Sequence, residues 1–291
     1  MSLPARPPLE VADCPFCGSA QRSNVYDLPP YAVARCRQCR LYYLSPRLPE
    51  ADMLAIYASG DYFEGAAVGY DSYARQRAAL RATFDRVSKA LVRMGAPGGD
   101  LLEVGAGYGL FLEAIRPAYG SVMGTEYSDA VAADGRSRGL DLRTGGIDAV
   151  PADRRFDCIV GAHVIEHVYD PRAFVAGLVD RLRPGGYLLL ATPDMGSPWR
   201  RAMGRRWPSF KVPEHVTYYD RRTLRALLVD ARLEDIRPFP YLHSFPLALI
   251  FRKLGAKSAE RRLGRVGEIP IPLPWTTLAL IARKPGRPDQ G

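Results

Sequence analysis

The sequence predicts an α/β protein built on a parallel β-sheet, preceded by a small module that a metal ion closes. Three observations predict this organisation. Residues 100–126 read as strand, glycine-rich turn, helix and second strand, the repeating unit of a parallel sheet. Apolar runs that suit buried strands follow at 156–161 and 187–192. Two C-x-x-C pairs stand near the N-terminus, at 14–17 and 36–39.

The composition is that of a globular protein with a basic surface. The 291 residues are 47% hydrophobic and carry a formal net charge of +9. This length holds one α/β domain of roughly 200 residues and a small module. The charge permits anionic partners such as nucleic acid, phosphorylated substrates or lipid headgroups, without selecting among them. No signal peptide or run of ~20 apolar residues is evident, so we predict a cytoplasmic protein.

The N-terminal cysteines have the spacing of a tetrahedral zinc site. Residues 18–35 separate the two pairs, whose members are Cys14, Cys17, Cys36 and Cys39. Two such pairs at this separation supply four thiolates, which closes the coordination shell and leaves no open position for catalysis. A ribbon over residues 11–48 is too small to fold on its core alone, so structural Zn²⁺ would supply folding energy. Its purpose stays open between a scaffold and a nucleic-acid contact.

Residues 49–95 are predicted to form linking helices that cap the site of the following domain. A short helix is expected over about 49–58 and a long one over about 70–94. Apolar residues of the long helix, from Leu80 to Met94, follow helical spacing. Gly95 ends it.

The glycine-rich turn predicts a nucleoside-binding site. Gly105, Gly107 and Gly109 allow a tight turn and a close approach of backbone to ligand. Glu126 ends the neighbouring strand, where its carboxylate accepts the hydroxyl protons of a ribose. The dinucleotide fingerprint places its third glycine where Leu110 stands. Glu103 beside the turn would repel a pyrophosphate but pair with an amine.

The remaining chain supplies the other predicted elements of the domain. A helix over 130–138, a strand over 140–143 and the turn Gly145–Asp148 precede the strand at 156–161. His163, Glu166 and His167 then follow; their order is not H-E-x-x-H, and no third metal ligand is evident. After the strand at 187–192 come a basic, irregular stretch at 193–220, a helix at 221–232, and strands at about 235–241 and 276–282.

Three motifs, in order, resemble the class I S-adenosylmethionine-dependent methyltransferases. They are LEVGAGYGLFLEAI, the Glu166-His167 pair after the fourth strand, and LRPGGYLLLATPD. The resemblance implies a Rossmann-like seven-stranded sheet with the last strand antiparallel, within a domain over 96–291 that carries a substrate-side insertion at about 193–220. Bacterial methyltransferases with similar N-terminal ribbons also share the segment Pro213-Glu214-His215.

The resemblance assigns roles to particular residues. Tyr73 and Arg77 would contact the carboxylate of the cofactor, and Ile147 and Asp148 would flank the adenine. The full set expected to bind S-adenosylmethionine is Tyr73, Arg77, Glu103, Gly105, Gly107, Gly109, Glu126, Tyr127, Ile147, Asp148, Ala162 and His163.

Methyl transfer to a hydroxyl needs a base, and three histidines are candidates. His215 comes first, followed by His163 and His167, since any imidazole titrates near neutral pH. His167 beside Glu166 is equally consistent with a purely structural hydrogen bond.

Three functions compete for this sequence. The first is methylation of a small molecule (a sugar, a nucleotide-linked compound or a natural-product intermediate) on oxygen, nitrogen or carbon. This acceptor is expected to be anionic if the arginines of 193–220 contact it. The second is an RNA methyltransferase that grips phosphates with the ribbon and the arginines, and the third is a non-catalytic binding module. The intact glycines and Glu126 argue against the third. The apolar stretch 243–254 is expected to form a helix that lines the substrate cleft or rests on a membrane surface.

Overall fold

The fold is taken from a computed structural model, which describes residues 8–58, 73–96, 98–253, 256 and 263–286. A seven-stranded sheet forms its centre, with the strand order β10-β13-β8-β7-β4-β5-β6. The bounds are β4 Asp100–Val104, β5 Ser121–Glu126, β6 Asp141–Thr144, β7 Phe156–Ala162, β8 Leu182–Pro193, β10 Glu234–Pro238 and β13 Thr277–Arg283.

The pairing of these strands confirms the predicted sheet. β4 pairs in parallel with both β5 and β7, and β7 pairs in parallel with β8. β13 lies antiparallel between β8 and β10. Leu101 and Leu102 of β4 are fully buried, as a central strand covered on both faces requires. The parallel strands therefore all end at one edge, where sheets of this kind bind ligands.

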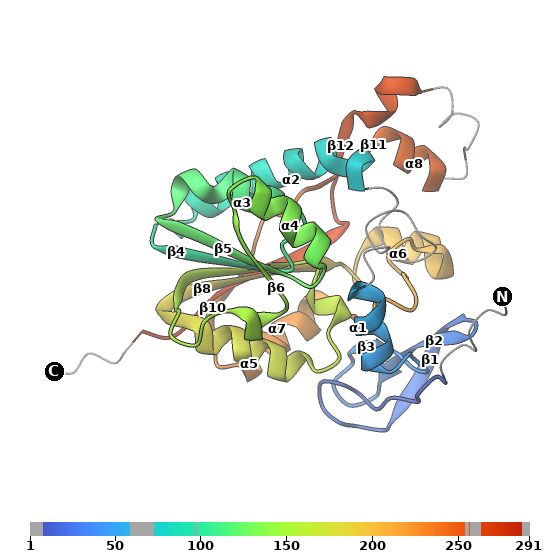
Figure 1. The fold of residues 1–291 in the computed structure, drawn as a ribbon. Coiled ribbons are helices and arrows are strands. Elements are labelled where there is room, and N and C mark those ends of the chain that lie inside the picture. The colour runs from blue at the N-terminus through green and yellow to red at the C-terminus, as the bar shows by residue number, and fades with distance from the viewer. Residues whose placement is uncertain (1–7, 59–72, 97, 254–255, 257–262, 287–291) are drawn as a thin grey trace.

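Helices cover both faces of the sheet (Figure 1). One face carries α2 Tyr73–Arg93, α3 Leu110–Ile115 and α4 Asp129–Ser137, and the other carries α5 Pro171–Arg181 and α7 Arg221–Asp230. Short 3-10 helices occupy several connections: η2 Arg116–Ala118, η3 Ile147–Ala149, η4 Ile165–His167, η5 Gly204–Arg206 and η6 Gly264–Glu268. Two large apolar clusters fill the layers between sheet and helices.

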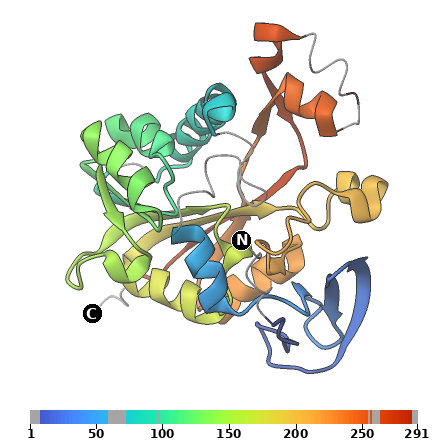
Figure 2. The ribbon, with the colours of Figure 1, turned by 45° about the vertical axis from the view of Figure 1, so that its right-hand side comes forward.

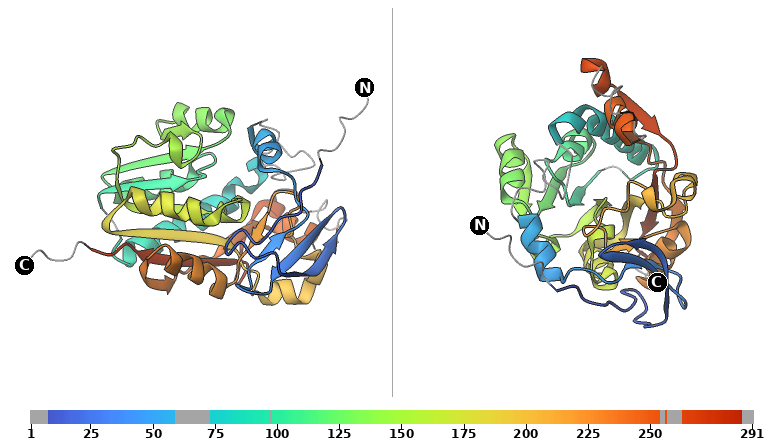
Figure 3. Two further views of the ribbon diagram at one scale, coloured as in Figure 1. Left: turned by 90° about the horizontal axis from the view of Figure 1, so that it is seen from below. Right: turned by 90° about the vertical axis from the view of Figure 1, so that its right-hand side faces the viewer.

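The N-terminal cysteine module consists of residues 11–48 and contains β1 Arg22–Leu28, β2 Tyr31–Cys36 and β3 Tyr42–Leu44. Helix α1, Glu50–Ala58, follows it, as predicted. The module lies beside the edge at which the parallel strands end (Figures 1 and 3). Its sheet has a fourth strand, β9 Thr217–Tyr218, contributed by a distant part of the chain.

Two predictions about the later chain are wrong in detail. The stretch 193–220 was expected to be irregular, but it contains α6 Pro198–Met203 and β9. Ser197 caps α6 by accepting a hydrogen bond from the Arg200 amide, which explains why a helix begins there. Residues 243–254 were expected to form a helix, but the first four form a strand.

This strand, β11 His243–Pro246, pairs antiparallel with β12 Pro270–Leu273. The prolines of IPIPLP extend β12, and α8 Leu247–Lys253 follows β11. The hairpin and α8 extend outward from the sheet (Figure 2). Within the described ranges, no helix is both long enough and apolar enough to cross a membrane.

Candidate active site

The glycine-rich turn begins where β4 ends. Gly105, Gly107 and Gly109 have φ values of 71°, 52° and 73°, in the left-handed region that favours glycine. A Cβ at Gly105 would lie 2.4 Å from Cγ2 of Val164, so only glycine fits there. The Ala106 amide donates to the carbonyl of Thr125 at 2.9 Å, which fixes the turn against β5.

Glu126 holds the turn from the tip of β5. Its Oε2 accepts a hydrogen bond from the Gly107 amide at 2.9 Å, and its Oε1 accepts from the Ser128 amide at 3.0 Å. Burial raises the pKa of Glu126 even though these amides oppose that shift. Each carboxylate oxygen has two lone pairs, so each retains one for a ligand hydroxyl.

Glu103 is a buried acid with an unsatisfied oxygen. Glu103 is 3% exposed, and its Oε2 has no hydrogen-bond partner within the part of the chain that the structure describes. Burial, reinforced by the charge of Glu126, raises the pKa of Glu103 well above its ordinary value. A cationic group bound against Glu103 would satisfy this oxygen and stabilise its charge. The ammonium and sulfonium of S-adenosylmethionine fit this requirement, and a pyrophosphate does not.

We expect Glu103→Gln to weaken binding of S-adenosylhomocysteine about 10- to 100-fold and to stabilise the ligand-free protein. The pKa of Glu103 is higher in the folded protein than in the unfolded chain, so losing its proton costs stability. The wild type should therefore lose stability as the pH rises above about 4.5, while the glutamine variant loses less. Thermal unfolding from pH 4.5 to 8 and calorimetric titration measure both effects; equal pH slopes would contradict the assignment.

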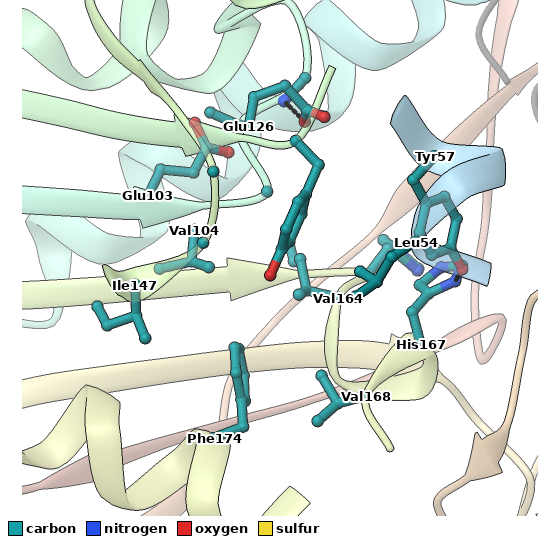
Figure 4. Close-up of a pocket in the computed structure, with 18 of the residues that line it drawn as sticks. Leu54, Tyr57, Glu103, Val104, Glu126, Ile147, Val164, His167, Val168 and Phe174 are labelled. Carbon is teal, nitrogen blue, oxygen red and sulfur yellow. Dashed lines mark hydrogen bonds between the residues drawn. The ribbon is translucent and has the colours of Figure 1, made fainter. Parts of the chain in front are cut away.

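These residues line one cavity of about 400 Å³ at the carboxyl edge of the sheet (Figure 4). The lining includes most of the residues predicted to bind the cofactor: Glu103, Gly105, Gly107, Glu126, Tyr127, Ile147, Asp148, Ala162 and His163. Ile147 and Phe174 both line the cavity (Figure 4). The structure thus brings together the glycine turn, the two carboxylates and the loop expected to flank the adenine.

Two residues predicted to bind the cofactor do not line the cavity, and the side chain of a third is not described. Gly109 begins α3 and packs on Leu140, where a Cβ would approach Cδ1 to 2.4 Å, so its role is to seat the helix. Arg77 is exposed on α2 and does not line the cavity. The side chain of Tyr73 lies outside the described residues.

His163 lines the same cavity. Its backbone has a φ of 59°, an uncommon conformation that clusters at functional sites. Its Nδ1 lies 3.2 Å from Oε1 of Glu166, and its buried Nε2 has no hydrogen-bond partner among the described residues. Because the carboxylate accepts, Nδ1 carries the proton and Nε2 carries a lone pair.

Glu166 is a buried anion that fixes this tautomer. It is 1% exposed, and its Oε2 accepts a hydrogen bond from the Thr192 hydroxyl at 3.0 Å. Burial raises the pKa of Glu166, but the His163 hydrogen bond and the nearby imidazoles outweigh it and hold the pKa below its ordinary value. An ionised Glu166 would stabilise the imidazolium that forms if His163 takes a proton.

His215, the first predicted base, does not line the cavity. His215 is 5% exposed and points Nδ1 at the Ser209 carbonyl, 2.8 Å away. Burial lowers its pKa well below the ordinary value. Its ring packs edge-on against His167, with centroids 4.7 Å apart.

His167 lines the cavity but has its Nδ1 occupied. That atom lies 2.8 Å from the Tyr57 hydroxyl and 3.1 Å from the Glu214 carbonyl. Burial lowers the pKa of His167. The sequence left two roles open for His167, a base or a structural hydrogen-bonding residue, and these contacts favour the structural role.

The cavity lining also contains residues that the sequence did not identify. Leu54 and Tyr57 come from α1, Leu80 and Phe84 from α2, and Tyr241 and His243 from the chain before and within β11. The His243 ring centroid lies 5.2 Å from that of His163, and burial lowers the pKa of His243 to about 3. Helical spacing did mark Leu80 and Phe84 as apolar, but no local signal linked them to a site.

The four cysteines of the N-terminal module converge as predicted. Their sulfur atoms all lie within 4.8 Å of one another, and none forms a disulfide. The Sγ atoms of Cys14 and Cys39 are 3.4 Å apart, and those of Cys17 and Cys36 are 3.5 Å apart. Zn–S bonds of about 2.3 Å in a tetrahedron give sulfur separations of about 3.8 Å, so the arrangement fits the metal.

The two cysteine pairs sit on matching turns. Gly18 and Arg40 each follow the second cysteine of a pair, with φ values of 71° and 74°. A hydrogen bond from the Cys14 thiol lowers the pKa of Cys39 to about 5. A thiolate at ordinary pH is the form that ligates metal.

The parallel sheet with its inserted antiparallel strand, together with this cavity, defines the class I S-adenosylmethionine-dependent methyltransferases. The methyltransferase-domain family Methyltransf_23 matches residues 70–237, more than half of the chain. The chain belongs to this family, and S-adenosylmethionine is the cofactor that family and cavity support.

Similar proteins carry methyltransferase names. A protein of Mycolicibacterium smegmatis named "Probable S-adenosylmethionine-dependent methyltransferase" is 37% identical over 173 residues, 58% of this chain and 65% of that protein. A ubiquinone biosynthesis O-methyltransferase of Parvibaculum lavamentivorans is 32% identical over 130 residues, 42% of this chain and 49% of that protein. The chain thus spans less than two thirds of the length of each of these relatives.

Solved structures share the fold. Magnesium protoporphyrin IX methyltransferase from Synechocystis, with S-adenosylhomocysteine bound, matches 81% of this chain and 100% of its own with a TM-score of 0.54 and 14% identity. An S-adenosylmethionine-dependent methyltransferase from Thermotoga maritima matches 73% of this chain and 94% of its own with a TM-score of 0.52 and 20% identity. At these identities the likeness concerns the fold alone.

Proposed function

We propose that this protein transfers a methyl group from S-adenosylmethionine to the hydroxyl of a small molecule, with His163 as the general base. The observation that carries the proposal is the free, buried Nε2 of His163 at the end of the cofactor cavity, with Glu166 behind it. The name of the Parvibaculum relative, an O-methyltransferase, is consistent with oxygen as the acceptor atom.

The reaction would be an in-line displacement. A lone pair of the acceptor oxygen attacks the methyl carbon as the carbon–sulfur bond breaks, and its electron pair leaves with the sulfur of S-adenosylhomocysteine. The hydroxyl proton passes to Nε2 of His163, whose imidazolium is stabilised by Glu166. Alignment and exclusion of water by the closed cavity supply much of the acceleration.

The lining of the cavity that contains His163 favours a small, largely apolar acceptor. Leu54, Leu80 and Phe84 contribute apolar surface, while the hydroxyl of Tyr241 and the ring of His243 add polar groups. Flat, partly aromatic molecules bind well to such walls. Methylation of RNA remains a separate prediction, which salt-sensitive binding of RNA would support.

The test is transfer of radiolabelled methyl from S-adenosylmethionine to a panel of phenols, catechols, sugars and matching amines. We expect transfer to at least one hydroxyl compound and loss of that transfer in His163→Gln. Transfer to amines alone, or an undiminished rate in His163→Gln, would contradict the assignment of oxygen and base.

We also propose that the four cysteines hold one structural Zn²⁺. Metal analysis of protein purified without chelator should give about one zinc per chain, and Cys39→Ser should give much less. Because a module this small has little core, we expect zinc removal to lower its resistance to proteolysis at least tenfold. Cys158→Ser is the matched control, since this buried cysteine lies in β7, away from the cluster. A folded, protease-resistant module without metal would contradict the proposal.

A further inference from the structure

The cysteine module shares a β-sheet with the catalytic part of the chain. β3 pairs antiparallel with β9, matching Tyr42 with Tyr218 and Tyr43 with Thr217. The Leu44 amide extends this ladder by donating to the Val216 carbonyl at 2.9 Å. Residues 214–218, here termed the clamp segment, therefore form the outer strand of the module and the approach to it.

The opposite side of the clamp segment holds η4. The Val216 amide donates to the Glu166 carbonyl at 2.8 Å, and the Thr217 hydroxyl donates to the Ile165 carbonyl at 3.0 Å. The Glu214 carbonyl lies 3.1 Å from Nδ1 of His167. The clamp segment thus contacts three consecutive residues of η4, and the module in turn holds the clamp segment through β3.

Apolar packing reinforces the same connection. Cys14, Cys36 and Tyr43 of the module share one buried cluster with Tyr219 and with Ile165 of η4. Val216, Thr217 and Tyr218 are each no more than 2% exposed. The cysteine cluster is therefore packed in the same core as η4, and the ribbon of the module lies against the rest of the fold (Figures 2 and 3).

The contacts from the module through the clamp segment lead to the proposed base, His163, and not to the residues that bind the methyl donor. η4 carries Glu166, whose carboxylate orients His163. The contacts of Glu126, by contrast, run to Gly107 and Ser128, on the other side of β4 from β7 and η4. Disturbing the module should therefore alter the base and spare the cofactor.

We propose that the metal-closed cysteine module is a positioning element for the base: it holds the clamp segment, which sets η4 and so the geometry of Glu166 and His163. This inference rests on the proposed zinc site and on His163 as the base. Thr217 and Val216 act as positioning residues, since neither lines the cavity.

The test uses the four histidines of the chain as reporters. Nitrogen spectra of the imidazoles, assigned by single His→Gln variants, give the tautomer and titration of each ring. Three proteins are compared: the zinc-bound wild type, the wild type after chelation, and zinc-bound Thr217→Val, which removes only the hydroxyl bond to η4. Thr144→Val is the matched control, because its hydroxyl bonds to Asp129 at the exposed β6 edge of the sheet.

We expect chelation and Thr217→Val to shift the His163 and His167 signals and to speed hydrogen exchange at the Val216 amide. Affinity for S-adenosylhomocysteine should stay within about threefold. In Thr217→Val, kcat for methyl transfer should fall about three- to tenfold with an altered pH profile, as loss of one buried hydrogen bond implies, and KM for the donor should hold.

Two results would overturn the proposal. One is that the His163 and His167 signals in the chelated protein and in Thr217→Val match the wild type. The other is that the chelated protein and Thr217→Val both lose S-adenosylhomocysteine binding together with the native histidine signals. The module would then be a general stabiliser of the fold. Neither of these outcomes requires a known acceptor. An undiminished rate of methyl transfer in His163→Gln would reject His163 as the base, but it would not contradict the structural coupling between the module and η4.

Discussion

His163→Ala is expected to lower kcat for methyl transfer about 10²- to 10⁴-fold, the usual contribution of a positioned general base. The variant removes Nε2 of His163, a buried nitrogen of the cavity lining that has no hydrogen-bond partner among the described residues. It also leaves Glu166 buried without the hydrogen bond that favours its ionised form. Single-turnover transfer at saturating S-adenosylmethionine measures the loss.

Two controls separate catalysis from folding. Affinity for S-adenosylhomocysteine should change by no more than about fivefold, since the glycine turn and Glu126 are untouched. Added imidazole should restore part of the rate by occupying the space that His163 vacates, and it should have no effect on His243→Gln. A wild-type rate in His163→Ala would show that the acceptor loses its proton elsewhere.

Glu126→Ala is expected to weaken binding of S-adenosylmethionine and its demethylated product about 100-fold or more. Each charge-assisted hydrogen bond contributes about 1.5–3 kcal/mol, and a ribose offers two hydroxyls to the carboxylate. The change also removes the acceptors of the Gly107 and Ser128 amides, so the turn itself loosens. Isothermal titration calorimetry measures the affinity directly.

Asp129→Ala provides the matched control, because this carboxylate stands three positions later in the chain and is exposed to solvent. Its removal should leave the affinity unchanged. Glu126→Gln should fall between the two, since the amide keeps one acceptor oxygen and loses the charge. If Glu126→Ala bound the cofactor like the wild type, the ribose would have to be recognised elsewhere.

The sequence predicted the donor half of the site well because that half is local. Gly105, Gly107 and Glu126 lie within one βαβ unit, where chain order and spatial order coincide. The cysteine cluster was predictable for a similar reason, since the metal geometry demands a spacing that can be read directly from the chain. Residues 100–126 therefore predict a nucleoside site, and with the motifs at Glu166-His167 and LRPGG they indicate the class of cofactor.

The acceptor half could not be predicted because it is assembled from distant segments. Leu54 of α1, Phe84 of α2 and His243 of β11 join His163 in one cavity lining only through folding. Periodicity reports that a residue is apolar or helical, but not which cavity it faces.

His215 shows the same limit. Its place in a family segment made it the first candidate, yet the clamp segment pairs with β3 and buries it behind His167. A strand of two residues, β9, has no signature that a single sequence reveals.

Calorimetric titration of the zinc-bound wild-type protein with S-adenosylhomocysteine, and in parallel with NAD, tests the central claim most directly. A sulfur-bearing nucleoside with a cationic end satisfies Glu103 and Glu126, whereas a pyrophosphate meets the charge of Glu103 beside the turn. We predict one binding site per chain for S-adenosylhomocysteine and no measurable heat for NAD. Binding of NAD, or of neither ligand, would contradict the account.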